Sequence, residues 1–148
     1  MKREIKFRAK VNGNWIVSNG FIKHPDGTIT IITKENIDNV ETSPIEEGTL
    51  CEFTGIKHKN KNDVFEGDIL KSLHFIDAKG EKLFLYHRVE WCERLTGWLA
   101  INMLNRTGDE VNGNPQLWCY VKDEFEIIGN IHDHKDLLEA NQNLNTVN

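Results

Sequence analysis

Two carboxylates flank a glycine in the stretch DVFEGDIL at residues 63–70. Glu66 and Asp68 lie two positions apart, so on a strand both side chains would project from one face, in the arrangement of a general acid and base. The same residues also fit a turn, because Gly67 can adopt a positive φ at little steric cost and Asp68 can accept backbone N–H bonds. The sequence implies no His, Lys or nucleophile partner, so the turn is the better interpretation.

We therefore predict a structural turn at Glu66, Gly67 and Asp68, and we give Gly55 and Gly129 the same structural role. If φ is positive at Gly67, Gly67→Ala should cost on the order of 1 kcal/mol or more. Glu66→Gln should be nearly neutral, because an exposed carboxylate contributes little to stability. The sequence assigns no catalytic residue.

Metal and cysteine chemistry have little support. The segment HDH at 132–134 would need at least one more ligand from elsewhere, and the other candidates are scattered: His58, His74 and His87. The three cysteines are odd in number and widely separated without a Cys-x-x-Cys pair, which argues against a disulfide framework and a zinc cluster. They are expected to be buried thiols: Cys51, Cys92 and Cys119. With no phosphate-binding glycine loop and no catalytic triad, we expect no metal, no cofactor and no enzyme activity.

Three tryptophans fall on predicted strands beside acidic neighbours such as Glu90 and Glu93: Trp91, Trp98 and Trp118. Acidic surroundings do not suit a platform for nucleic-acid bases, and tryptophan on a strand is more often part of the core. We expect all three to be core residues.

The composition is that of a soluble globular domain, with 39% hydrophobic and 28% charged residues in 148. No apolar run approaches the roughly 18 residues of a membrane helix. The first residues are positively charged but lack the apolar stretch of a secretion signal. We expect a cytoplasmic protein that does not bind membranes.

Charge is distributed unevenly along the chain. Residues 1–34 hold seven Lys/Arg and two acids, a balance of +5, whereas residues 35–55 hold six acids and no Lys/Arg, a balance of −6. The total of −5 disfavours nucleic acid unless basic residues gather on one face. The candidate interaction residues lie in two basic segments, 2–10 and 57–61: Lys2, Arg3, Lys6, Arg8, Lys10, Lys57, Lys59 and Lys61.

Alternation of apolar and polar residues predicts strands through most of the chain. The clearest lie at 4–11, 15–17, 28–33, 50–54, 68–75, 82–91, 97–103, 117–121 and 125–131, with turns at 12–14, 24–27 and 77–80. The acidic stretch 34–48 shows no sustained period and is expected to cover the surface or form one helical turn. The polar stretch 105–116 is expected to be a mobile loop. Only 135–140 looks helical, capped by Asp133 or His134.

These elements predict a mainly β protein. Residues 1–45 would form an N-terminal β-hairpin lobe. Residues 46–148 would form a small SH3-like barrel or a strongly bent antiparallel sheet, with a short C-terminal helix and a frayed tail.

Three blocks, IKFRA at 5–9, EFTGIKHKNKNDVFEGDIL at 52–70 and EFEIIGNIHDHKDLL at 124–138, with VEW at 89–91 between the last two, resemble the YopX family in order along the chain. The resemblance implies a mainly β protein of phage or prophage origin, in the cytoplasm of a bacterial host, from a family whose biochemical role is not established. Lys61 stands where family members often carry glycine, which predicts a different geometry for the loop at 57–63.

Two functions from different classes remain open. The first is a non-catalytic accessory protein that acts through contacts with a phage or host protein and forms a homo-oligomer, with the basic and acidic blocks pairing between subunits. The alternative is a nucleic-acid-binding accessory protein that uses the two basic segments.

Overall fold

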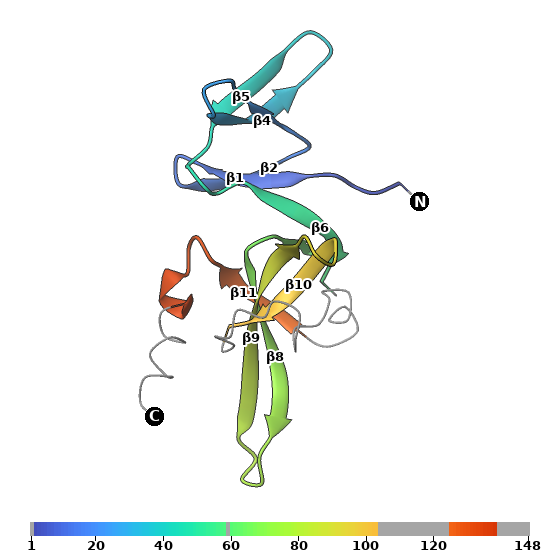
Figure 1. The fold of residues 1–148 in the computed structure, drawn as a ribbon, viewed down its shortest axis with the longest axis vertical. Coiled ribbons are helices and arrows are strands. Elements are labelled where there is room, and N and C mark those ends of the chain that lie inside the picture. The colour runs from blue at the N-terminus through green and yellow to red at the C-terminus, as the bar shows by residue number, and fades with distance from the viewer. Residues whose placement is uncertain (1, 59, 104–124, 139–148) are drawn as a thin grey trace. The chain divides into compact units, whose positions relative to one another are not determined.

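The computed structural model describes residues 2–58, 60–103 and 125–138, and these residues are mainly β (Figure 1). The chain divides into two compact units, Met1–Gly55 and Ile56–Asn148. A short helical turn at 135–138 follows the last described strand. In the described part of the chain, no helix is long and apolar enough to cross a membrane.

The first unit opens with an antiparallel pair, β1 (Phe7–Val11) and β2 (Asn14–Ser18). The turn between them has positive φ at both Asn12 and Gly13, the conformation that favours Asn-Gly in two-residue hairpins. A second, three-stranded sheet has the order β3-β4-β5, from β3 (Phe21–Lys23), β4 (Ile29–Glu35) and β5 (Val40–Pro44). The two sheets share a core of Ala9, Val11 and Ile31.

The stretch 34–48, expected to cover the surface or form one helical turn, instead contains the strand β5. This strand is polar and mostly exposed, and it forms by pairing with β4 rather than by burying an apolar face. Lys34 and Glu41 add an ion pair at 3.6 Å between the two strands. Hydrophobic periodicity does not detect a strand of this kind.

The first unit ends at Gly55. Ile45 and Leu50 pack against its core. Cys51 and Glu52, at the start of β6 (Cys51–Lys57), pair with β1. The segment after β5 thus completes the first unit, and β6 crosses the division.

The second unit is built around a four-stranded antiparallel sheet of order β10-β9-β8-β11. Its strands are β8 (Asp68–Ile76), β9 (Lys82–Cys92), β10 (Gly97–Asn102) and β11 (Phe125–Asn130), and the short β7 (Asp63–Phe65) precedes them beside the end of β6. The sheet is strongly curled, which confirms the predicted bent sheet. The predicted short C-terminal helix is also present. One face buries Val64, Leu70, Val89, Ala100 and Phe125.

The β8–β9 hairpin is longer than the strands beside it. β11 pairs with β8 only along 68–72, and β10 pairs with β9 only along 87–92, with one more backbone bond from Met103 N to Tyr86 O. Residues 73–84, which we call the arm, pair only with each other among the described residues. Figure 1 shows β8 and β9 continuing past β10 and β11 to the tip. At the tip, Asp77 Oδ1 accepts bonds from the backbone N–H groups of Lys79 and Glu81.

Candidate functional site

The turn at 66–68 is built from backbone bonds and a buried carboxylate. Gly67 has φ of +78°. Its N–H donates to Val89 O at 2.9 Å, and its carbonyl accepts from Ile131 N at 2.9 Å. Asp68 is buried, and its Oδ2 accepts from Phe65 N at 2.9 Å. Asp68 therefore closes the turn that leads into β8.

The two acids of this turn have different surroundings. Asp68 is fully buried at the start of β8, whereas Glu66 is half-buried and lines a surface hollow. A pair of carboxylates acting on one substrate would have to share a face. The structure does not bring these two together as such a pair.

The other two glycines have different structural reasons. Gly55 lies within β6 with φ of +84°, in the left-handed region that favours glycine. Gly129 lies at an irregularity in the pairing of β11 with β8. A Cβ there would come within 2.4 Å of His134 Nδ1, so Gly129 is required for the close approach of the ring rather than for a turn.

Two histidines of the second unit take structural hydrogen bonds. The buried His58 donates through Nε2 to Phe125 O at 2.5 Å and accepts from Asn60 N through Nδ1 at 3.3 Å. His134 Nδ1 accepts from Asn130 N at 3.2 Å. Across the described ranges, no group of three His, Cys, Asp or Glu side chains is placed to hold a metal ion. Cys51 and Cys92 are free and buried, as expected of core thiols, and Cys119 lies outside the described residues.

The basic residues of 2–10 lie in the first unit, and several have partners there. Arg3 pairs with Glu52 at 2.9 Å. Lys6 is buried, pairs with Glu4 at 3.0 Å and lies over the Phe53 ring. Two further cations, both half-buried, lie over the half-buried Trp15 ring of the β1–β2 pair: Arg8 and Lys10, at 4.8 and 5.8 Å from its centroid. The first basic segment is thus largely engaged within its own unit.

The second basic segment belongs to the second unit. Lys57 pairs with Asp63 at 3.3 Å, and Lys59 is not among the described residues. Lys61 has φ of +64°, and its N–H donates to His58 O at 2.7 Å. The tight turn therefore forms with lysine in the left-handed conformation.

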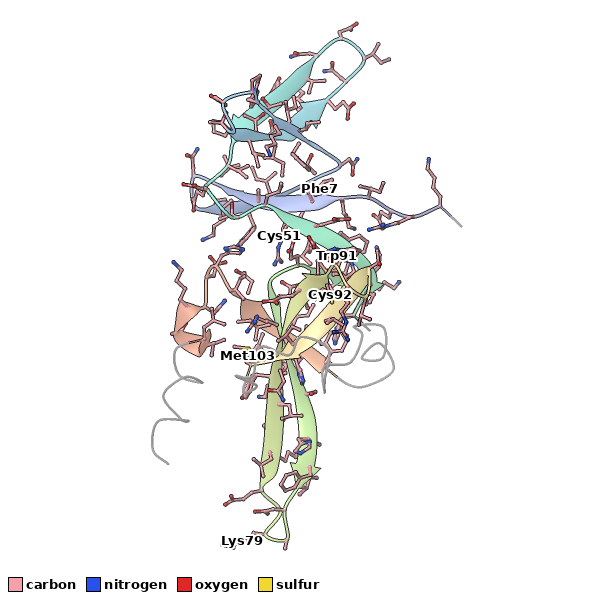
Figure 2. The ribbon with its side chains drawn as sticks, in the orientation of Figure 1. Phe7, Cys51, Lys79, Trp91, Cys92 and Met103 are labelled. Carbon is pink, nitrogen blue, oxygen red and sulfur yellow. The ribbon has the colours of Figure 1, made fainter. Side chains whose placement is uncertain are left out.

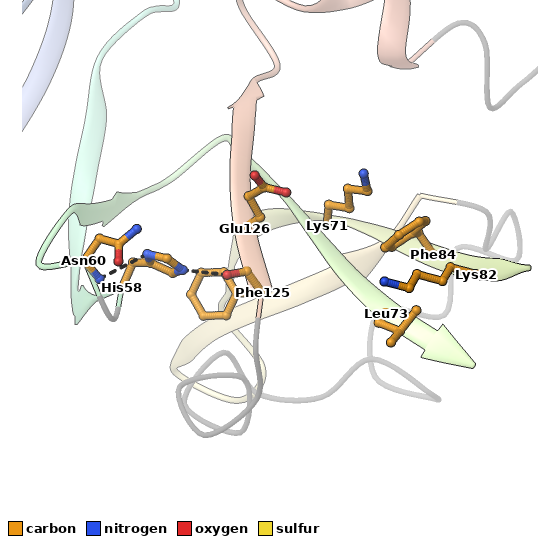
Figure 3. Close-up of a pocket in the computed structure, with 8 residues that line it drawn as sticks. All are labelled: His58, Asn60, Lys71, Leu73, Lys82, Phe84, Phe125 and Glu126. Carbon is orange, nitrogen blue, oxygen red and sulfur yellow. Dashed lines mark hydrogen bonds between the residues drawn. The ribbon is translucent and has the colours of Figure 1, made fainter. Parts of the chain in front are cut away.

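A hollow of about 340 Å³ lies where the arm meets the sheet. Figure 3 shows the residues that line it. Lys71, Lys82 and Phe84 line it, with Lys71 Nζ 4.1 Å from the Phe84 ring centroid. His58 and Phe125 lie on its other side, joined by the hydrogen bond described above. Because the His58 imidazole already binds the β11 backbone, we assign it a structural role, which is to hold the turn at 58–62 against the sheet.

The arm itself exposes apolar side chains, which sequence reasoning missed. Four of them have about half of their surface exposed, from 47% to 54%: Leu73, Phe75, Ile76 and Leu83. Figure 2 shows the side chains projecting from this hairpin toward its tip at Lys79. Alternating apolar residues predicted the strands, but no local signal says that β10 and β11 stop short of them.

The expectation that Trp91 is a core residue is wrong. Trp91 is 42% exposed, and its ring stands edge-to-face against Trp98 at 5.1 Å and 72°. Trp98 is half-buried and packs against the core, as expected. Trp118, the strand expected at 117–121 and the loop expected at 105–116 lie outside the described residues.

Comparison with known proteins identifies the family of this chain. The family model described as YopX protein matches residues 6–139. The chain belongs to the YopX family. No curated protein matches the sequence. Among solved structures, protein EF1440 from Enterococcus faecalis is similar, with 22% sequence identity over 90% of this chain and 97% of that chain and a TM-score of 0.47.

Proposed function

We propose that this YopX-family protein is a non-catalytic, phage- or prophage-encoded accessory protein that acts in the cytoplasm through protein–protein contacts and self-associates through its arm. The observation that carries the proposal is the run of exposed apolar side chains on a hairpin with unpaired edges in the described part of the chain. A two-stranded hairpin is marginally stable alone in water, and unpaired strand edges readily accept another chain. Docking would therefore stabilise the arm.

A second copy of the chain suits the charges at the arm's tip. The tip carries two acids and two bases within six residues: Asp77, Lys79, Glu81 and Lys82. A surface with this balance is complementary to its own copy, as the self-matching interface of a two-fold dimer requires. The basic block of 1–34 gives less support, because Arg3 and Lys34 already pair with acids of 35–55 in the same chain.

Size exclusion with light scattering tests the proposal over a range of protein concentrations. The wild-type protein is expected to be a dimer or larger. The double variant Phe75→Ser and Leu83→Ser removes two apolar side chains that pair across the arm, and it should be monomeric. Ile37→Ser is the matched control, because Ile37 is fully exposed in a turn of the first unit.

High salt separates the arm from pairing of charged blocks. Contact through apolar side chains should persist at high salt, whereas contact between exposed charges should weaken. A wild-type protein that is monomeric at every concentration contradicts self-association. If the arm variant of such a monomeric protein is also less stable than the wild type, the arm packs on its own chain instead.

Nucleic-acid binding is the second candidate, and one observation favours it. Arg8 and Lys10 lie over Trp15 and so combine cations with an aromatic ring on the β1–β2 pair. Filter binding of single-stranded RNA and DNA across a salt series tests this. Phosphate contacts predict a steep fall in affinity with salt. Absence of binding at low ionic strength would remove the candidate.

A further inference from the structure

Trp91 lies in a hollow at the end of the β9–β10 hairpin, away from the arm. The hollow is wide and open, about 810 Å³, and is lined by Glu66, Trp91, Glu93 and Arg94. Figure 2 labels Trp91 at this end of β9, beside Cys92. The edge-to-face contact with Trp98 holds the indole while 42% of Trp91 remains exposed. An indole held in this way is a rigid aromatic wall.

Backbone hydrogen bonds fix the two turns that carry Glu66 and Glu93. Glu93 begins the turn that joins β9 to β10, closed by Thr96 N donating to Glu93 O at 3.1 Å. Glu66 belongs to the turn that Gly67 fastens to β9 through Val89 O, two residues before Trp91. The backbone positions of the two acids therefore follow from the fold of the second unit.

We propose that this hollow binds one ammonium or guanidinium group between the Trp91 indole and the carboxylates of Glu66 and Glu93. The face of an indole attracts a cation through its quadrupole, and tryptophan does so best among the aromatic side chains. Two carboxylates at the same hollow add attraction for positive charge. A lysine or arginine side chain of another protein, or a free polyamine, supplies this chemistry. The site does not depend on self-association through the arm.

Arg94 lines the same hollow and carries the group that the site would recognise. It therefore acts as a competitor from within the chain. Removing it should strengthen binding of an external cation, whereas removing a residue that contributes to binding would weaken it. Arg94→Ala thus changes affinity in the direction opposite to that of the other lining residues.

The test is a titration followed by the tryptophan indole N–H signals in NMR, with Trp91→Phe identifying the Trp91 signal. The probes are N-acetyl-lysine methylamide, its glutamine counterpart and spermidine. The lysine probe should shift the Trp91 indole with an affinity on the order of millimolar, as one cation–π contact and exposed ion pairs allow. The glutamine probe should not. Equal shifts with both probes would overturn the proposal.

Variants then assign the groups. Glu66→Gln with Glu93→Gln should weaken lysine binding by about fivefold or more. Glu35→Gln with Glu47→Gln removes the same charge from exposed positions of the first unit and should leave it unchanged. Retained dispersion of the four indole signals shows that each variant is folded. Equal weakening in both pairs would mean a general charge effect and contradict the site. Much tighter binding of spermidine than of the lysine probe would identify a free polyamine as the ligand, and similar binding a protein side chain.

Discussion

The base and the arm of the β8–β9 hairpin share the same antiparallel pairing but have different neighbours. In the base, β11 covers one edge and β10 the other, and Leu70 and Val89 are fully buried. In the arm no described strand lies at either edge, and Leu73 and Leu83 are each 47% exposed. Leu70 and Leu73 are only three residues apart on β8.

This difference separates what a strand pair supplies from what a sheet supplies. Cross-strand contacts contribute a few tenths of a kcal/mol to about 1 kcal/mol for each pair, and they are present in both halves. Full burial of a leucine contributes about 1.5–3 kcal/mol and is present only in the base. The base should therefore hold the stability of the second unit, and the arm should be available for binding.

Truncation of matched leucines gives the largest expected effect. Leu70→Ala should lower the free energy of unfolding by about 2–5 kcal/mol, as for other buried leucines. Leu73→Ala should lower it by less than about 1 kcal/mol in the monomer. Urea denaturation at a dilution where the protein is monomeric measures both. Similar losses at the two positions would break the distinction between base and arm.

Acidification should act through a histidine of the base. Burial lowers the pKa of His87 from its ordinary 6.5 to about 4. The unfolded chain therefore binds more protons between these values, and stability falls as pH drops from about 6.5 to 4. Because a tenfold difference in proton affinity between the two states corresponds to about 1.4 kcal/mol, the loss is on the order of 1–3 kcal/mol.

Denaturation at a series of pH values tests this assignment. His87→Gln should make the free energy of unfolding depend less on pH between about 6.5 and 4. His74→Gln is the matched control, because it also removes one imidazole but from an exposed position on the arm. A limb of unchanged slope in His87→Gln would assign the acid sensitivity to other groups.

Two glycines with the same backbone conformation should respond differently to alanine. Gly67 and Gly80 have φ of +78° and +84°, which penalises any Cβ by about 1 kcal/mol or more. A Cβ on Gly67 would also lie 3.2 Å from Ile131 Cγ1, whereas one on Gly80, at the tip of the arm, meets nothing within 4 Å. Gly67→Ala should therefore cost about 2 kcal/mol and Gly80→Ala about 1 kcal/mol. Chemical denaturation of both variants measures the difference, and equal costs would show that backbone strain alone acts at both positions.

Much of this architecture could be predicted from local sequence. The strands expected at 68–75, 82–91 and 97–103 correspond to β8, β9 and β10, and the Asn-Gly turn at 12–13 has the predicted conformation. Alternation and turn residues act within a few positions, so they locate strands and hairpins. They do not show which strands are neighbours at an edge.

What could not be predicted depends on those distant neighbours. Glu66 and Asp68 are both acids beside Gly67, and local sequence does not distinguish them. Asp68 is nevertheless buried by the sheet, whereas Glu66 lines a hollow. Trp91 reads as core, but it lies near the end of β9, where its indole is only partly covered. The arm is exposed because β11 begins at Phe125, opposite Ser72 of β8. Each of these outcomes is set by residues far away in the chain.

Substitution of Lys61, in the turn beside the base, should change the free energy of unfolding least. Lysine at φ of +64° is strained by about 1–2 kcal/mol, and glycine relieves this strain while making the unfolded chain more flexible. Lys61→Gly should therefore stabilise the protein by less than about 1 kcal/mol. Lys61→Ala removes the same charge but keeps the Cβ, so it should give no gain. His58 ties this turn to β11, so hydrogen exchange should slow at amides of the base and not of the arm. Equal gains from glycine and alanine would point to lost charge rather than relieved strain.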